Sequence, residues 1–311
     1  MRFSIAHSLS LSTLNKIKNI IDTKLYPQIK KFDVTMSNGL ASIPKIYTLD
    51  EKKIILKKIM NVYKPHSLEI GSLVSPKVVP QMKQSYELYN YANKLYNKKT
   101  NVCDFYLLVP PTKHYLDIAQ KLNIRNISLH TSVSEAFHKQ NNSQSSLRET
   151  KIMIKEFIKK PNNFDKVKLY VSCIPNCPIK GKQDKEHIIN ELYEYLHIDG
   201  ISEVCLTNTC DTMRYSEFIH IIDYLNIEMN YKLEKLSLHL HINQNENKYY
   251  TLDNIIEYAI TNNIIRFDLT SFENIYFGNS IIKVDIKNFN RNLTYDRLYE
   301  SIYDTIMYRI K

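Results

Sequence analysis

Short apolar runs alternate with longer amphipathic segments along almost the whole chain. The runs are rich in Val, Ile, Leu, Phe and Tyr, which favour strands, and turn residues separate them from their neighbours. Eight such runs are predicted as strands: 31–36, 67–74, 103–110, 126–131, 167–174, 202–209, 235–242 and 264–271. The segments between them repeat apolar residues at intervals of three and four, as amphipathic helices do.

Eight repeats of strand and helix predict an α/β fold with a parallel sheet. At this chain length the repeats fit a single closed (β/α)8 TIM barrel better than a doubly wound sheet, since no GxGxxG phosphate turn is present. We assign residues 31–311 to the barrel and residues 1–30 to an N-terminal extension. The extension has no acid before Asp22 and several serines, so it is either a short helix or a weakly transit-like segment.

The composition is that of a globular protein: 311 residues, 43% hydrophobic and 24% charged. The net charge of +10 favours anionic ligands, but Lys and Arg are spread along the chain. We therefore expect no nucleic-acid partner. No apolar run approaches the roughly 20 residues of a membrane span. The five cysteines are odd in number and the chain is large, so we do not expect a disulfide framework. We expect a cytoplasmic protein, with organelle targeting by the N-terminus as the alternative.

Two histidines stand two residues apart in the run SLHLHI. A strand alternates its faces, so His239 and His241 should point the same way. In a TIM barrel they would lie at the C-terminal end of a strand, where active sites form. The pair is a candidate for metal binding; the alternative is two polar residues that line the barrel mouth.

Several of these strand ends together resemble one family. The carriers of the resemblance are LEIGSLVSPKVVPQM (68–82), SVSEAFHKQN (132–141), YVSCIPNCPIKGK (170–182), SLHLHI (237–242) and NLTYDRL (292–298). In this order, and from about Lys31 to the C-terminus, the chain is similar to the 3-hydroxy-3-methylglutaryl-CoA (HMG-CoA) lyases, metal-dependent TIM barrels. The resemblance implies the retro-Claisen cleavage of HMG-CoA to acetyl-CoA and acetoacetate.

The resemblance also implies a divalent cation, Mg²⁺ or Mn²⁺, held by an Asp, two His and an Asn. His239, His241 and Asn292 match three of these ligands. Asn38 stands at the position of the Asp, so the set contains no anion. Because Mg²⁺ and Mn²⁺ favour carboxylate oxygens, we expect weak binding of the cation.

Three further catalytic positions of the family are replaced. Ser37, Asn208 and Phe277 stand where the family has an Arg, an Asp and a Cys. Glu69 matches a family glutamate, and Asp296 replaces another glutamate by a side chain one methylene shorter. The retained catalytic candidates are therefore Glu69, His239 and Asp296.

Residues on two neighbouring loops are candidates for contact with CoA or the substrate. They are Ser134, Lys139, Asn141, Lys180 and Lys182. The lysines could meet CoA phosphates, although solvated loop residues explain them equally well.

The sequence thus predicts an HMG-CoA lyase-like protein that is impaired or inactive in the retro-Claisen cleavage and that binds an acyl-CoA or a protein partner. One alternative is an active carbon–carbon lyase on HMG-CoA or a related hydroxyacyl-CoA. Another is altered chemistry that uses Glu69, His239 and Asp296. The resemblance also suggests a homodimer.

Overall fold

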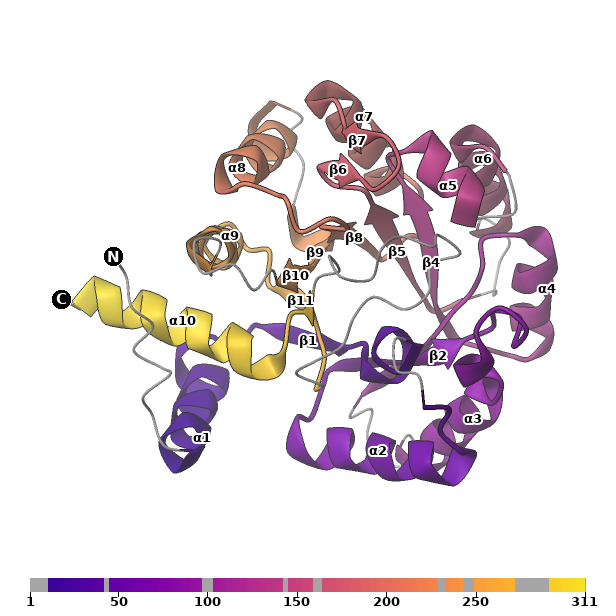
Figure 1. Cartoon of the computed structure of the whole chain (residues 1–311), viewed down its shortest axis with the longest axis horizontal. Helices are drawn as coiled ribbons and strands as arrows, with labels where there is room; N and C mark the ends of the chain where they lie inside the picture. Colours follow the sequence, from indigo (N-terminus) through magenta and orange to yellow (C-terminus); the bar gives the residue numbers. More distant parts are fainter. Residues whose placement is uncertain are drawn as a thin grey trace.

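Eight parallel strands close into a barrel, and helices surround it (Figure 1). The computed structural model describes residues 11–41, 45–96, 103–141, 145–158, 164–228, 233–242, 249–271 and 291–310. The strands follow one another around the barrel in the order β1, β2, β3, β4, β5, β8, β9 and β11, and β11 pairs with β1. The predicted (β/α)8 barrel is confirmed.

Each barrel strand overlaps one of the eight predicted runs. Their bounds are Lys30–Asp33 (β1), Ser67–Ser72 (β2), Asp104–Leu108 (β3), Asn126–Ser132 (β4), Lys166–Ser172 (β5), Glu203–Thr207 (β8), Leu236–His239 (β9) and Arg266–Leu269 (β11). The strands are buried almost throughout, because their inner faces fill the barrel and their outer faces meet the helices.

The helices form the outer ring, as Figure 1 shows. Their bounds are Leu11–Ile20 (α1), Leu49–Val62 (α2), Ser85–Tyr96 (α3), Lys113–Lys121 (α4), Glu135–Asn141 (α5), Leu147–Ile158 (α6), Lys185–Leu196 (α7), Tyr215–Asp223 (α8), Tyr249–Thr261 (α9) and Tyr295–Ile310 (α10). Local sequence sets their starts. Before α2, for example, Thr48 and Glu51 form a reciprocal capping box, which satisfies two backbone N–H groups.

Shorter elements lie between the barrel strands and the helices. Single π-helical turns span Ile21–Leu25, Thr35–Gly39 and Tyr224–Glu228, and 3₁₀ turns span Pro80–Met82 and Leu233–Lys235. Two small antiparallel ladders join β6 (Asn176–Cys177) to β7 (Gly181–Lys182) and β10 (His241–Ile242) to β12 (Arg291–Asn292). The second ladder sets His241 directly opposite Asn292.

The segment before β1 packs against the last helix, beside which α1 lies in Figure 1. Lys18 forms an ion pair with Asp296 of α10. Asp22 accepts hydrogen bonds from Lys31, at 2.8 Å, and from Tyr299. The short helix expected here is therefore α1, while the domain boundary at residue 30 stays a prediction.

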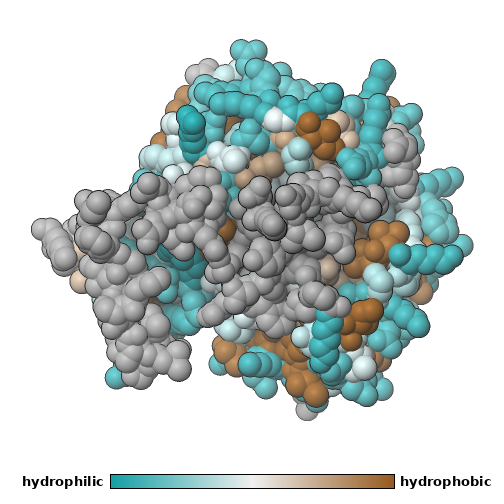
Figure 2. Space-filling view, in the orientation of Figure 1, coloured by the Kyte–Doolittle hydropathy of each residue, from teal (hydrophilic) through white to brown (hydrophobic). Residues whose placement is uncertain are grey.

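The outer surface is largely hydrophilic where Figure 2 shows described residues. The exposed large apolar side chains are distributed along the chain, from Ile20 to Ile227. Among the described residues no helix has the length and apolar character needed to cross a membrane. The cytoplasmic location and the homodimer stay predictions.

Candidate functional site

A cavity of about 240 Å³ opens at the C-terminal ends of the barrel strands. Apolar side chains from β3 and from the segments after β1 and β2 form part of its wall, among them Val34, Val74 and Leu108. Its polar lining consists of Ser37, Asn38, Glu69, Ser72, His130, Tyr170, Ser172, Thr207 and His239. Neither lysine nor arginine contributes a side chain to the described lining.

The two histidines converge at this end of the barrel. Strand β9 ends at His239, and His241 belongs to the small ladder above it. Their Nε2 atoms nevertheless lie 3.2 Å apart, and both side chains are buried. Burial lowers the pKa of His241 well below its usual range, and the charge of His239 lowers it further. The neutral imidazole, which is the form that binds metals, is thus the stable form of His241.

Asn38 and Asn292 meet beside the histidines. Asn38 lies on the π-helical turn after β1, and its Oδ1 accepts a hydrogen bond of 2.8 Å from Asn292 Nδ2. Asn292 in turn lies opposite His241 in the ladder. The structure therefore brings together the four residues predicted as metal ligands.

This donor set is a poor fit for Mg²⁺ or Mn²⁺. Both ions take hard oxygen ligands and are held mainly by carboxylates, whereas the set offers two imidazoles and two neutral amides. Within the described residues, no group of three or more His, Cys, Asp and Glu side chains is arranged to hold a metal ion. A softer divalent ion finds two nitrogens at a suitable spacing, but no anionic ligand.

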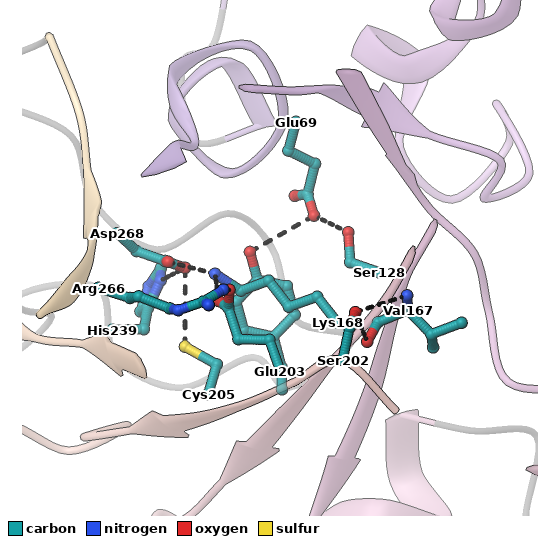
Figure 3. A network of polar contacts seen from close by, with 11 residues as sticks. Glu69, Ser128, Val167, Lys168, Ser202, Glu203, Cys205, His239, Arg266 and Asp268 are labelled. Atoms are coloured by element: carbon teal, nitrogen blue, oxygen red, sulfur yellow. Dashed lines mark hydrogen bonds and ion pairs between the residues drawn. The ribbon is translucent and has the colours of Figure 1, made fainter. Parts of the chain in front are cut away.

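A carboxylate contacts His239 on the ring nitrogen that does not face His241. Asp268 Oδ2 lies 3.0 Å from Nδ1 of His239, and Lys168 Nζ pairs with the other carboxylate oxygen (Figure 3). Burial by itself would raise the pKa of Asp268, but the Lys168 ammonium and the contact with His239 outweigh it and lower the pKa. Asp268 is thus ionised. Its Oδ2 accepts the hydrogen bond that Nδ1 of His239 donates, and this contact orients the His239 ring.

Lys168 and Asp268 were not predicted as site residues from the sequence. Lys168 also pairs with Glu203 at 2.8 Å, and Glu203 pairs with Arg266 at 3.1 Å, so the network continues along the barrel interior. Figure 3 shows these side chains grouped between the strands. The sequence did contain a signal: the run VKLYV carries one charged residue and the run RFDLT carries two, where buried strands are otherwise apolar.

Glu69 occupies the other side of the cavity. Ser128 Oγ donates a hydrogen bond to its Oε2, and the Tyr170 hydroxyl donates a second at 3.4 Å. Burial raises the pKa of Glu69, and hydrogen bonds from Ser128 and Ser37 offset part of that effect. The carboxyl group therefore binds a proton more tightly than an exposed glutamate does.

Two of the replaced positions lie close to these groups. Ser37 is buried, and its hydroxyl donates to the Val34 carbonyl at 3.3 Å. Asn208 follows β8, accepts a hydrogen bond from Thr212 N at 3.2 Å, and lines a neighbouring cavity of about 550 Å³ together with His241. Neither side chain brings a charge.

Asp296 is not among the described lining residues. Its side chain is 47% exposed and pairs with Lys18 in the first turn of α10. Phe277 lies outside the described residues. Of the retained catalytic candidates, the structure thus brings only Glu69 and His239 to one cavity.

The residues predicted on the CoA side lie on α5, the loop before it and the β6–β7 ladder. Ser134 is buried and donates to Cys177 Sγ at 3.1 Å, which joins the two loops. Lys139 pairs with Glu135 at 3.1 Å, and Asn141 donates to the Phe137 carbonyl at 2.8 Å.

On the ladder, Lys182 is exposed and pairs with Glu217 at 2.7 Å. Lys180 is exposed as well. An anionic ligand can therefore reach both ammonium groups.

Comparison with known proteins points in one direction, although no family model matches the chain. The curated hydroxymethylglutaryl-CoA lyase of Pseudomonas mevalonii is 26% identical over 199 residues, which are 63% of this chain. The chain spans 62% of the length of that relative.

Solved structures agree in fold. The hydroxymethylglutaryl-CoA lyase of Pseudomonas aeruginosa superposes with a TM-score of 0.71 at 20% identity, covering 91% of this chain and 86% of that chain. The HMG-CoA lyase of Acinetobacter baumannii, solved in complex with coenzyme A and 3-methylmalate, gives 0.70 at 17% identity and covers 91% and 85%. This chain is thus similar in sequence to a curated HMG-CoA lyase and shares the TIM-barrel fold of the solved HMG-CoA lyases.

Proposed function

We propose that this protein binds an acyl-CoA thioester in the cavity at the barrel mouth and cleaves HMG-CoA far more slowly than its relatives do. One observation carries the proposal. At the place where His239 and His241 converge, Asn38 and Asn292 supply neutral amides that bond to each other, and the described residues include no group of three or more His, Cys, Asp and Glu side chains that could hold a metal ion.

The impairment follows from the charge that the reaction develops. Breaking the carbon–carbon bond leaves an enolate on the thioester, which needs a cationic or strongly donating partner. Ser37 stands where the family has an arginine, and the described lining contains no lysine or arginine. Removal of one preorganised oxyanion donor typically slows a reaction about 10²–10³-fold.

The binding half of the proposal rests on the cavity itself. A concave, partly apolar space with a few polar groups is typical of small-molecule sites. The exposed ammonium groups of Lys180 and Lys182 give the neighbouring loop a positive charge that suits CoA phosphates. A relative of the same fold was solved with coenzyme A.

Two measurements on the purified full chain test the two halves separately. Titration calorimetry with a non-hydrolysable thioether analogue of HMG-CoA measures binding. An acetoacetate assay with HMG-CoA and excess Mg²⁺ or Mn²⁺ measures cleavage, with an active family member alongside. We expect binding together with cleavage at least about 10²-fold below the active relative. A cleavage rate less than about 10²-fold below that of the active relative would favour the active-lyase alternative instead.

A restored variant addresses the cause of the impairment. Ser37→Arg, Asn38→Asp, Asn208→Asp and Phe277→Cys together return the charges and the thiol that the family has at these positions. The variant should bind Mn²⁺ and release acetoacetate faster than the native chain. A variant that folds but binds no Mn²⁺ would contradict our assignment of Asn38 to the ligand position.

A second candidate function uses the two retained groups in a different reaction. Tyr170 lies between them. Its hydroxyl donates a hydrogen bond to Glu69, and its ring meets the His239 ring edge-on, with 5.8 Å between the ring centroids. Glu69→Gln should then abolish an activity found by substrate screening, whereas Asp296→Asn should leave it unchanged because Asp296 pairs with Lys18 instead.

A further inference from the structure

A serine and a histidine from adjacent strands form a hydrogen-bonded pair in the cavity wall. His130 Nε2 lies 2.7 Å from Ser172 Oγ. His130 belongs to β4 and Ser172 ends β5, and the two strands pair in register from Asn126↔Lys166 to Ser132↔Ser172. Both residues line the cavity that we assign to the acyl-CoA. Neither Glu69 nor the paired histidines 239 and 241 take part in this contact.

The backbone holds Ser172 firmly. Its carbonyl accepts hydrogen bonds from Val133 N at 3.1 Å and from Ser132 Oγ at 3.2 Å. These bonds hold the main chain of Ser172 at the position from which its hydroxyl contacts His130. Burial, together with the neighbouring His138 and His239, lowers the pKa of His130 to about 4, so the ring is neutral at pH 7 and can accept a proton.

The next barrel strand, β8, places a further hydroxyl, that of Thr207, at the level of Ser172. The β5–β8 register runs from Lys168↔Glu203 to Val171↔Leu206, which places Thr207 beside Ser172. Thr207 lines the same cavity and is 3% exposed. Its Oγ1 is buried and has no hydrogen-bond partner among the described residues. A buried hydroxyl without a partner is costly in a folded protein, and a bound ligand oxygen would satisfy it.

We propose that Ser172 is a nucleophile that hydrolyses acyl-CoA thioesters, with His130 as its general base and Thr207 as a hydrogen-bond donor to the oxyanion. The inference rests on the proposed binding of acyl-CoA in this cavity and adds an activity that the carbon–carbon lyase reaction does not include.

The first half of the reaction forms an acyl-enzyme. Ser172 Oγ attacks the thioester carbonyl carbon while its proton passes to His130 Nε2. The carbonyl electrons move onto oxygen, where the Thr207 hydroxyl donates a hydrogen bond. When the carbonyl re-forms, the carbon–sulfur bond breaks. The leaving thiolate takes the proton from His130 and departs as free CoA thiol.

The second half restores the enzyme. A water molecule attacks the ester carbonyl and gives a proton to His130. The carbon–oxygen bond to Ser172 breaks, the carboxylic acid leaves, and Ser172 regains its proton from His130. The sum is one thioester and one water converted to one carboxylic acid and one thiol, with no oxidant, reductant or metal required.

The first experiment follows release of free CoA thiol from acetyl-CoA and HMG-CoA with a thiol-reactive dye. Ser172→Ala should reduce the rate to background. His130→Gln keeps an acceptor for the Ser172 hydroxyl but cannot take its proton, and it should cost about 10²–10⁴-fold. Thr207→Val keeps the shape of the side chain and should cost about 10²–10³-fold. Ser301→Ala removes a buried hydroxyl on α10 and serves as the control with an unchanged rate.

Mass spectrometry of protein quenched during turnover supplies a direct readout. We expect an acyl adduct on Ser172 that is absent from Ser172→Ala. If the thioether analogue binds but no thiol is released above the level of Ser172→Ala, the hydrolase is excluded and the binding function stands.

If the thioether analogue does not bind, the function proposed above fails, and a small fluorophosphonate decides on the dyad by itself. Labelling of Ser172 in the native chain, lost in His130→Gln, would support an activated serine. Absence of labelling would overturn the proposal even in a folded protein.

Discussion

The barrel interior and the cavity above it differ in their content of charged side chains. Inside the barrel, Lys168 pairs with Asp268 and Glu203, and Glu203 pairs with Arg266 (Figure 3). In the cavity, Asn38 bonds to Asn292 through neutral amides, and the described lining carries neither lysine nor arginine. Strands only a few residues long thus carry a dense ion-pair network at one level and a nearly uncharged pocket at the next.

The difference separates charges that hold the fold from charges that would serve a ligand. A buried charge persists when neighbouring strands supply its partner, because removal of either partner leaves an uncompensated ion. A charge that faces a cavity has its partner only while the ligand is present. Loss of a charge of the second kind leaves the fold intact, so the chemistry of such a cavity can change while the barrel stays the same.

Removal of the central lysine should cause the largest effect. Lys168→Met leaves Asp268 and Glu203 buried without their common cation, and we expect a loss of about 3–5 kcal/mol in the free energy of unfolding. Urea denaturation measures it. Lys166 lies two residues away on the same strand and pairs with Asp104 at the surface. Lys166→Met should cost less than about 1 kcal/mol, and equal losses in the two variants would contradict the comparison.

Asp33 shows what happens to a buried carboxylate without a lysine partner. Its contacts are the Tyr295 hydroxyl and Thr35 N, both at 2.8 Å, and burial raises its pKa from 3.8 to about 6. The folded protein therefore binds this proton more tightly than the unfolded chain does. The resulting stability is fully present below about pH 4 and is lost as the pH rises through about 6, a change of about 3 kcal/mol.

The Asp33→Asn variant removes that titration. The stability difference between native chain and variant, followed by urea denaturation, should change by up to about 3 kcal/mol between pH 4 and pH 7, in favour of the native chain at low pH. Asp50→Asn replaces an exposed carboxylate and should show no comparable change. A difference that stays constant over this range would mean that Asp33 titrates normally.

A single charge returned to the cavity should have an intermediate effect. Asn38→Asp adds a carboxylate beside the two histidines, and the affinity for Mn²⁺, measured by calorimetry, should rise at least about tenfold. Asn141→Asp adds the same charge on α5 and controls for nonspecific attraction. If both variants gain equally, the gain comes from net charge and not from the site.

The smallest effect concerns the loop lysines. Lys180→Ala should weaken binding of the thioether analogue by about twofold to fivefold, as expected for one exposed charge pair. Lys182→Ala should cost less, because Lys182 already pairs with Glu217. Unchanged affinity in both variants would place the CoA phosphates elsewhere.

The strand pattern and the motifs at the strand ends were sufficient to predict the barrel and the grouping of Asn38, His239, His241 and Asn292. Both depend on short-range periodicity and on the rule that parallel strands bring their C-terminal ends together. The convergence of the histidines did not require an unbroken strand. The barrel strand ends at His239, and the ladder to Asn292 carries His241.

The rest depended on contacts that no local pattern encodes. The position of Asp296 in the first turn of α10 says nothing about the helix that packs there, and Lys18 lies 278 residues away in sequence. His130 and Ser172 belong to separate motifs, and only the register of β4 and β5 brings them within 2.7 Å. Pairings of this kind become predictable once the inner face of each barrel strand is written out and neighbouring strands are compared.

The hydrogen bond between Asn38 and Asn292 determines which substitutions residue 38 can accept without loss of that contact. Asn38 contributes its Oδ1 as the acceptor, and aspartate presents an oxygen at the same place. Replacement of asparagine by aspartate at residue 38 therefore exchanges one nitrogen for one oxygen and preserves the hydrogen bond from Asn292. A single substitution at residue 38 therefore separates the neutral cavity seen here from one that carries a negative charge beside the two histidines.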